Sequence, residues 1–194
     1  MISLPSLKAD ILACRACEPE LPMGARPVFR ASESAQLLIV GQAPGRRVHE
    51  TGIPFNDPSG DRLREWMGID RDTFYDEAKL AIIPMGFCYP GTGKSGDLPP
   101  RPECAKLWRE KLLAQLPNIK LTLAIGQYAL SYHIPNNPHK NLTETVKHWQ
   151  DYLAEKHLIP LPHPSPRNNL WLKKNPWFEA EVLPMLQSRI ANIL

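Results

Sequence analysis

Four short, uninterrupted apolar runs constrain the fold of this chain more than any other feature of its sequence. They lie at residues 37–41, 80–85, 121–126 and 158–162. Because polar residues do not alternate along them, they are typical of parallel strands that are buried on both faces. Helical patterns lie between and after them, at residues 60–67, 101–116, 127–132, 142–155 and 175–193. This order predicts an α/β fold, a three-layer α/β/α sandwich around a central, mainly parallel four-stranded sheet with right-handed crossovers.

Length and composition favour one globular domain over residues 1–194. The chain has a mass of 21.9 kDa, with 43% hydrophobic and 22% charged residues, which is enough to bury a core. Its first residues are interrupted by Pro5, Lys8 and Asp10, and no apolar run has membrane-spanning length. We therefore expect a cytoplasmic protein without a membrane partner, and take a monomer as the default. A net charge of +3 does not by itself identify a nucleic-acid-binding protein.

Three segments rich in Gly and Pro follow the first, second and fourth predicted strands. They lie at residues 41–45, 86–93 and 163–168. Each one alone is explained as a tight turn. Since the carboxyl ends of parallel strands meet at one edge of the sheet, the three together predict a binding site there.

The four cysteines have a spacing that suits metal ligation. Cys14 and Cys17 form a C-x2-C pair, while fifteen residues separate Cys88 from Cys104. In a reducing compartment such residues are thiols or metal ligands, not disulfides. Four thiolates suit a 4Fe-4S cluster, and zinc accepts the same set. The plainer interpretation of Cys88 and Cys104 is that they are small buried hydrophobic residues.

Two motifs resemble those of known enzymes. The stretch from Gly41-Gln-Ala-Pro-Gly45 to Gly60 is similar to the first motif of the family 4, iron–sulfur uracil-DNA glycosylases, with Pro54 and Phe55 in register. His163-Pro-Ser-Pro-Arg-Asn168 is similar to the second motif of that superfamily, most closely in the single-strand-selective monofunctional enzymes. The resemblance implies a monofunctional DNA glycosylase of base excision repair, acting on DNA that contains a damaged base. It also favours a 4Fe-4S cluster over zinc.

The chain departs from the family pattern at two places. Gln42 stands where the family has Glu, so that a carboxylate base is lost. The family also has an Asn just before its third cysteine that reads the edge of uracil, whereas this chain has Pro84-Met-Gly-Phe-Cys88. The base to be excised is therefore either uracil or another deaminated base.

The resemblance assigns Phe55, Ala43 and Phe87 to base binding. Phe55 would stack on a base that has been turned out of the helix. His163 would donate a hydrogen bond to the pyrimidine oxygen, where negative charge collects as the glycosidic bond breaks. It is our first candidate for a catalytic residue.

The remaining candidates each have two interpretations. Gln42 either positions the attacking water or anchors its turn to the backbone. Asp57 either assists that water or caps the helix that begins at Pro58. DNA-contacting candidates on the same loops are Ser165, Arg167, Asn168 and Lys94. Of these, Ser165 would hold a phosphate and Arg167 would fill the gap left by the flipped nucleotide.

Two other classes of function compete with a glycosylase. One is a metal-bearing nucleic-acid-binding protein of the same fold that has lost catalysis. The other is a dinucleotide-binding α/β enzyme, which ranks last because no G-x-G-x-x-G stretch directly follows the first predicted strand.

Overall fold

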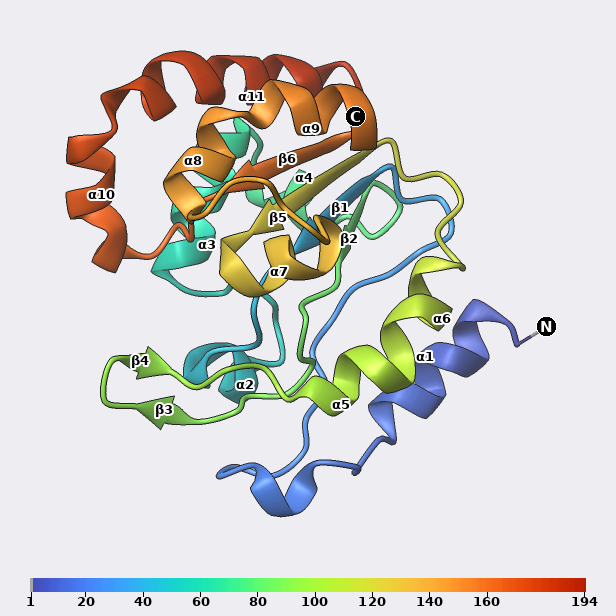
Figure 1. Cartoon of the computed structure of the whole chain (residues 1–194). Helices are drawn as coiled ribbons and strands as arrows, with labels where there is room; N and C mark the ends of the chain where they lie inside the picture. The colour runs from blue at the N-terminus through green and yellow to red at the C-terminus, as the bar shows by residue number, and fades with distance from the viewer. Residues whose placement is uncertain (1) are drawn as a thin grey trace.

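The computed structural model describes residues 2–194, and a four-stranded parallel sheet lies at its centre (Figure 1). Its strands are β1 (Leu37–Val40), β2 (Leu80–Ile82), β5 (Leu121–Ile125) and β6 (Leu158–Leu161), in the order β2-β1-β5-β6. Every neighbouring pair is parallel. All four strands begin at the first residue of the predicted runs and end one to three residues earlier, so the predicted sheet is confirmed.

Side chains of β1 alternate between two apolar cores, which explains why the strand is apolar throughout. Leu38 and Val40 pack in the core that includes residues of α1 (Leu4–Leu12), α6 (Glu110–Leu113) and α7 (Gly126–His133). Leu37 and Ile39 pack in the core that includes residues of α3 (Pro58–Met67), α4 (Arg71–Tyr75) and α11 (Leu183–Ala191). Figure 1 shows α1 and α6 on one side of the sheet and α11 on the other. The predicted three-layer α/β/α sandwich is therefore confirmed.

Several helices differ in detail from the predicted ranges. The predicted helix 142–155 is divided at His148 into α8 (Leu142–Lys147) and α9 (Trp149–Lys156). The range 101–116 contains α5 (Pro102–Cys104), a π-helical segment η2 (Ala105–Arg109) and α6. In the range 175–193, the π-helical segment η4 (Phe178–Val182) precedes α11. Within residues 2–194, no helix is both long and apolar enough to cross a membrane.

Other elements lie outside every predicted range. They are α1, η1 (Glu18–Glu20), α2 (Arg46–Thr51), α4, η3 (Pro166–Asn168), α10 (Asn169–Lys174) and an antiparallel hairpin of β3 (Thr92–Gly93) and β4 (Gly96–Asp97). Most are single turns or short helices in segments for which no helix or strand is predicted. The hairpin matters most, because it forms part of the site described below.

A buried arginine ties η2 to the carboxyl end of β2. Arg109 is 1% exposed, and its Nη1 donates to the carbonyl oxygens of Ile83 and Pro84 at 3.2 and 3.0 Å. Its Nη2 lies 2.9 Å from Nε2 of His133, and its guanidinium lies 4.9 Å from the ring centroid of Tyr132. Since an arginine can only donate, His133 must accept through an unprotonated nitrogen. Burial, together with the charge of Arg109, lowers the pKa of His133 to about 3.

This pair predicts an acid-sensitive fold. Above pH 6.5 His133 is neutral in both the folded and the unfolded chain. Below pH 6.5 His133 binds a proton in the unfolded chain, whereas in the folded chain it stays neutral until the pH approaches 3. The free energy of unfolding therefore decreases as the pH falls from 6.5 towards 3. We expect about 1–2 kcal/mol of the free energy of unfolding to be lost between pH 7 and pH 5 through this group. Urea denaturation at the two pH values measures it.

The matched control is His133→Gln, which keeps an oxygen acceptor for Arg109 and does not titrate. Its loss of stability between pH 7 and pH 5 should be smaller than that of the wild type by about the same amount. Equal acid losses in the two proteins would show that His133 does not set this dependence.

Candidate active site

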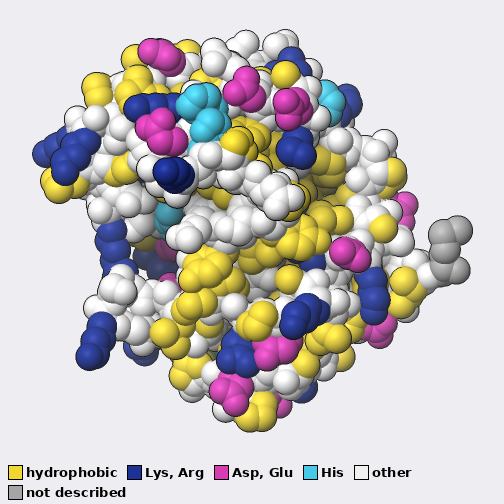
Figure 2. Space-filling view, in the orientation of Figure 1, with side chains coloured by type: hydrophobic (Ala, Val, Ile, Leu, Met, Phe, Trp, Pro, Cys, Tyr) yellow, Lys and Arg dark blue, Asp and Glu magenta, His cyan; other side chains and the backbone are white. Residues whose placement is uncertain are grey.

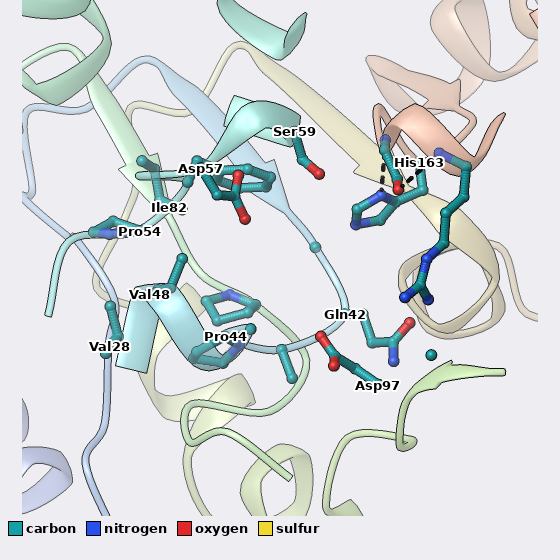
Figure 3. A pocket seen from close by; sticks show the side chains of 18 of the residues that line it. Val28, Gln42, Pro44, Val48, Pro54, Asp57, Ser59, Ile82, Asp97 and His163 are labelled. Atoms are coloured by element: carbon teal, nitrogen blue, oxygen red, sulfur yellow. Dashed lines mark hydrogen bonds between the residues drawn. The ribbon is translucent and has the colours of Figure 1, made fainter. Parts of the chain in front are cut away.

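A cavity of about 460 Å³ lies at the carboxyl edge of the sheet (Figure 3). The loops that follow β1, β2 and β6 all contribute to its lining, and two of the three predicted segments, 41–45 and 163–168, meet there. After β2 the lining comes from Pro84 and from residues 95–97 of the hairpin, not from the predicted segment 86–93. The volume lies within the range of about 300–1,000 Å³ that is usual for small-molecule sites.

Phe55 forms a fixed wall of this cavity. Its backbone adopts a left-handed conformation with φ of 54°, which is uncommon for an aromatic residue. Its ring lies against Gly41, where an added Cβ would be 3.4 Å from Cζ of Phe55. It also packs edge-on against Phe74, with ring centroids 6.1 Å apart. Such a backbone persists only where the surroundings impose it, so the ring is held in place before any ligand arrives.

His163 enters the cavity from the loop after β6 with a defined tautomer. Its Nδ1 accepts a hydrogen bond from the backbone N–H of Ser165 at 3.2 Å, and its carbonyl oxygen accepts one from Nδ2 of Asn168 at 2.7 Å. Burial lowers the pKa of His163, while the carboxylates of Asp57 and Asp97 act in the opposite direction. The neutral ring therefore carries its proton on Nε2, which makes that nitrogen a hydrogen-bond donor.

Gln42 and Asp57 both line the cavity, and both bind backbone groups. Nε2 of Gln42 donates to the carbonyl oxygen of Leu98 at 3.0 Å, so the side chain anchors the hairpin segment and not its own turn. Oδ1 of Asp57 accepts from the N–H of Gly60 at 2.8 Å, which is the helix-capping bond of the second interpretation above.

The β3–β4 hairpin closes one side of the cavity. Nη1 of Arg167 donates to the carbonyl oxygen of Ser95 at 3.3 Å, and Gln42 holds the other end of the hairpin through Leu98. Asp97 reaches the lining from this hairpin. In Figure 3 its carboxylate lies beside Gln42, and His163 lies farther off on the other side of Gln42.

The structure gathers most of the predicted site residues but not all of them. Around the cavity lie Gln42, Ala43, Phe55, Asp57, His163, Ser165, Arg167 and Asn168. Phe87 does not line it. Instead, Phe87 is 2% exposed and packs against Phe29 in the core, with ring centroids 5.3 Å apart. Lys94 is exposed in the turn of the hairpin and does not line the cavity either.

The four cysteines meet at a second, small cavity. Cys14, Cys17, Cys88 and Cys104 all line it, and all four are free thiols. Nε1 of Trp108 donates to the sulfur of Cys14 at 3.4 Å. Burial raises the pKa of Cys88 to about 12 and that of Cys104 to about 11. Nearby positive charge, such as that of a bound metal, is therefore needed to make them thiolates at neutral pH.

The sulfur atoms are not arranged around a single ion. In the described part of the chain, no three His, Cys, Asp or Glu side chains form a group that could hold one metal ion. Tetrahedral zinc needs four sulfurs at about 2.3 Å from one centre. A cluster takes the same four donors with its iron and sulfur atoms between them. The four sulfur donors that line this cavity suit either group.

Among the residues of the site that sequence reasoning missed are Asp97, Pro84 and Arg62. Arg62 donates from Nη1 to the carbonyl oxygen of Ser165 at 3.1 Å and so fixes the loop of His163. The spacing Gly93-Lys-Ser-Gly96 is a hairpin signal that could have located Asp97 at a turn. Neither Pro84 nor Arg62 has such a local signal.

Comparisons with known proteins agree with this geometry. Residues 29–187 match the family described as the uracil DNA glycosylase superfamily. Over 157 residues the chain is 29% identical to a Thermotoga maritima protein named Type-4 uracil-DNA glycosylase, covering 78% of this chain and 76% of that protein. Over 137 residues it is 26% identical to an Archaeoglobus fulgidus protein of the same name, covering 68% of this chain and 64% of that protein. The chain therefore belongs to the uracil-DNA glycosylase superfamily.

Proposed function

We propose that this chain is a monofunctional DNA glycosylase that hydrolyses the N-glycosidic bond of uracil or another deaminated base in DNA, the first step of base excision repair. The observation that carries the proposal is a neutral His163, with Nε2 free to donate, in the same cavity as the fixed ring of Phe55. The names of the two relatives, both Type-4 uracil-DNA glycosylases, support it.

Phe55 and His163 would have different roles in excision: Phe55 would hold the base, and His163 would stabilise its negative charge as it leaves. The target nucleotide must leave the base stack before its glycosidic bond can be reached. In the cavity, stacking on Phe55 would contribute about 1–3 kcal/mol to holding the base. As the bond breaks, negative charge collects on the departing base, and the Nε2–H of His163 would stabilise it as an oxyanion hole does.

The apolar end of the cavity bears on which base is excised. Ile82 and Pro84 line it, and Pro84 has no N–H to offer. The resemblance to family 4 implies an Asn near this position, and this chain has none there. We therefore propose uracil or another deaminated base as the substrate, without an amide side chain at this wall to read the edge of the base.

The DNA-contacting surface would surround the mouth of the cavity. We propose that Ser165, Arg167 and Asn168 contact the strand beside the flipped nucleotide, and that Lys94 contacts a phosphate from the tip of the hairpin. Figure 2 shows Lys and Arg side chains along the left edge, above and below a hollow between the α10 side and the hairpin side of the molecule. This placement supports DNA binding despite a net charge of only +3.

An excision assay tests the proposed function. Labelled oligonucleotides carrying uracil, hypoxanthine, xanthine or a thymine mismatch are incubated with the protein, and abasic sites are revealed as alkali-sensitive breaks. We expect breaks at uracil or at one of the other deaminated bases. Intact oligonucleotides in all four reactions would contradict the proposal.

We also propose that Cys14, Cys17, Cys88 and Cys104 hold a 4Fe-4S cluster. Their common cavity supports metal ligation, and the resemblance to the iron–sulfur family 4 enzymes favours the cluster over zinc. When bound, the cluster would join the N-terminal segment to the loop after β2 and to α5. Four unbridged thiols also support a reducing compartment, which we propose to be the cytoplasm.

Anaerobic purification should therefore give a brown protein with about four iron atoms per chain. Cys17→Ser should lower the iron content and the midpoint of thermal unfolding more than it lowers single-turnover excision, because Cys17 does not line the base cavity. A colourless protein in which metal analysis finds neither iron nor zinc would contradict metal ligation. A zinc content of about one per chain would replace the cluster with the alternative metal.

A further inference from the structure

We infer that Asp97, on the β3–β4 hairpin, is the carboxylate that activates the attacking water. This inference rests on the proposed glycosylase function and adds a catalytic residue to it. Gln42 leaves the first motif without a carboxylate at the position where the family has Glu. In the structure the carboxylate of Asp97 lies beside Gln42 and supplies the missing charge from another part of the chain (Figure 3).

The hairpin is attached to the site at both of its ends. Gln42 binds the carbonyl oxygen of Leu98, next to Asp97, and Arg167 binds the carbonyl oxygen of Ser95. Arg167 also occupies the space beside Gly96, where an added Cβ would lie within van der Waals overlap of its guanidinium. Two loops that belong to the site therefore hold the position of Asp97.

A hydroxyl pair orients the carboxylate of Asp97. Oγ1 of Thr92 donates to Oδ1 of Asp97 at 3.1 Å, and the hydroxyl of Tyr89 lies 2.6 Å from the same Oγ1. The second oxygen, Oδ2, lies on the side of Gly45, where an added Cβ would be 3.3 Å away. One oxygen is thus occupied, and the other faces the loop of the first motif, where it can accept a proton from water.

The sheet order places Asp97 and His163 on different sides of the cavity. The hairpin follows β2, at one edge of the sheet, and His163 follows β6, at the other edge. Hydrolysis needs that separation, because the departing base and the attacking water occupy opposite faces of the sugar carbon. Asp97 is exposed, whereas Asp57 is half-buried and its Oδ1 caps the helix α3.

The proposed step is a hydrolysis in which Asp97 takes one proton. The oxygen of water bonds to the sugar C1′ and the C1′–N bond breaks, its electron pair leaving with the base. One water proton passes to the Asp97 carboxylate, and the abasic sugar keeps the hydroxyl. The base anion, held by the Nε2–H of His163, then takes a proton from solvent, and Asp97 returns its proton to solvent.

The test is Asp97→Asn in single-turnover excision of the base that the wild type removes. Asn keeps an oxygen acceptor for Thr92 but cannot take a proton, so we expect the rate to fall by about a hundredfold. Affinity for DNA with an abasic site should stay within a few-fold of the wild type. Asp72→Asn, an exposed acid of α4, changes the net charge equally and should excise at the wild-type rate.

Chemical rescue distinguishes a residue that acts as a general base from one that has only a structural role. Azide is a nucleophile that needs no deprotonation, so added sodium azide should restore base release by Asp97→Asn while changing the wild-type rate little. A wild-type rate for Asp97→Asn, or a loss that azide does not restore, would overturn the inference and leave the proposed function intact. A wild type that is inactive on every substrate would overturn the proposed function and this inference with it.

Discussion

His163→Ala is expected to lower the single-turnover excision rate by about 100- to 1,000-fold, the usual effect of losing one oxyanion-hole donor. The reason is the geometry of the ring, whose Nδ1 is occupied by the N–H of Ser165 while Nε2 keeps the proton. That donor gains strength only as negative charge develops on the base. The loss should therefore appear in the chemical step, and affinity for abasic DNA should be nearly unchanged.

Substrates whose bases differ in leaving-group ability provide a sharper control for the proposed role of His163. A base that departs easily, such as 5-fluorouracil, carries its own charge stabilisation and should suffer a smaller loss in His163→Ala. Gln42→Ala provides a comparison in which the second anchor of the hairpin is removed and His163 remains. A uniform loss in His163→Ala for good and poor leaving groups, or a loss confined to DNA binding, would make His163 a structural residue of its loop.

The core of the fold could be predicted from sequence because strands buried on both faces leave a local signal. Leu37 to Val40 are all apolar because alternate side chains enter two different cores. Side chains of the other three strands also enter both cores. Short elements such as α2 and α4 left no such signal. They cover few apolar residues, although local caps mark some of their ends, such as Gly52 after α2 and Asp70 before α4.

The division of the predicted helix 142–155 has a visible cause. His148 ends α8 with φ of −96° and ψ of 28°, and its ring stacks on His139 with centroids 3.9 Å apart. Its Nδ1 also lies 2.8 Å from the carbonyl oxygen of Glu144. These contacts come from a neighbouring loop and from the helix itself, so the hydrophobic period could not have revealed the break.

In the candidate site, too, residues that belong to a local motif could be predicted, whereas residues positioned by distant contacts could not. His163 and Phe55 were found because a local motif carries each of them, and the structure brings both to one cavity. Phe87 was also assigned to base binding, but its ring turns into the core beside Phe29. Asp97 was missed because its role depends on hydrogen bonds from Gln42 and Arg167, which hold its hairpin from distant parts of the sequence.

Gly60→Ala is expected to lower the free energy of unfolding by about 3 kcal/mol or more, at the upper end of overpacking effects. Gly60 lies in α3, where Ala alone would be better by about 1 kcal/mol. An added Cβ, however, would overlap the carbonyl oxygen of Phe55, and it would lie 2.6 Å from the carbonyl carbon. These are backbone atoms, so the segment of Phe55 must move away from the helix, and excision should fall with stability.

Gly126→Ala is the matched control, because nothing lies within 4 Å of the added Cβ and its φ of 79° leaves only backbone strain. That strain should cost about 1–2 kcal/mol, without an effect on excision at a temperature where the variant is folded. Thermal unfolding and single-turnover excision of both variants measure the contrast. The left-handed backbone of Phe55 and the missing side chain at position 60 are two parts of one contact, which holds the stacking ring against Gly41. If Gly60→Ala proved as stable and as active as the wild type, Phe55 would not be fixed by this contact, and its stacking role would lose its structural basis.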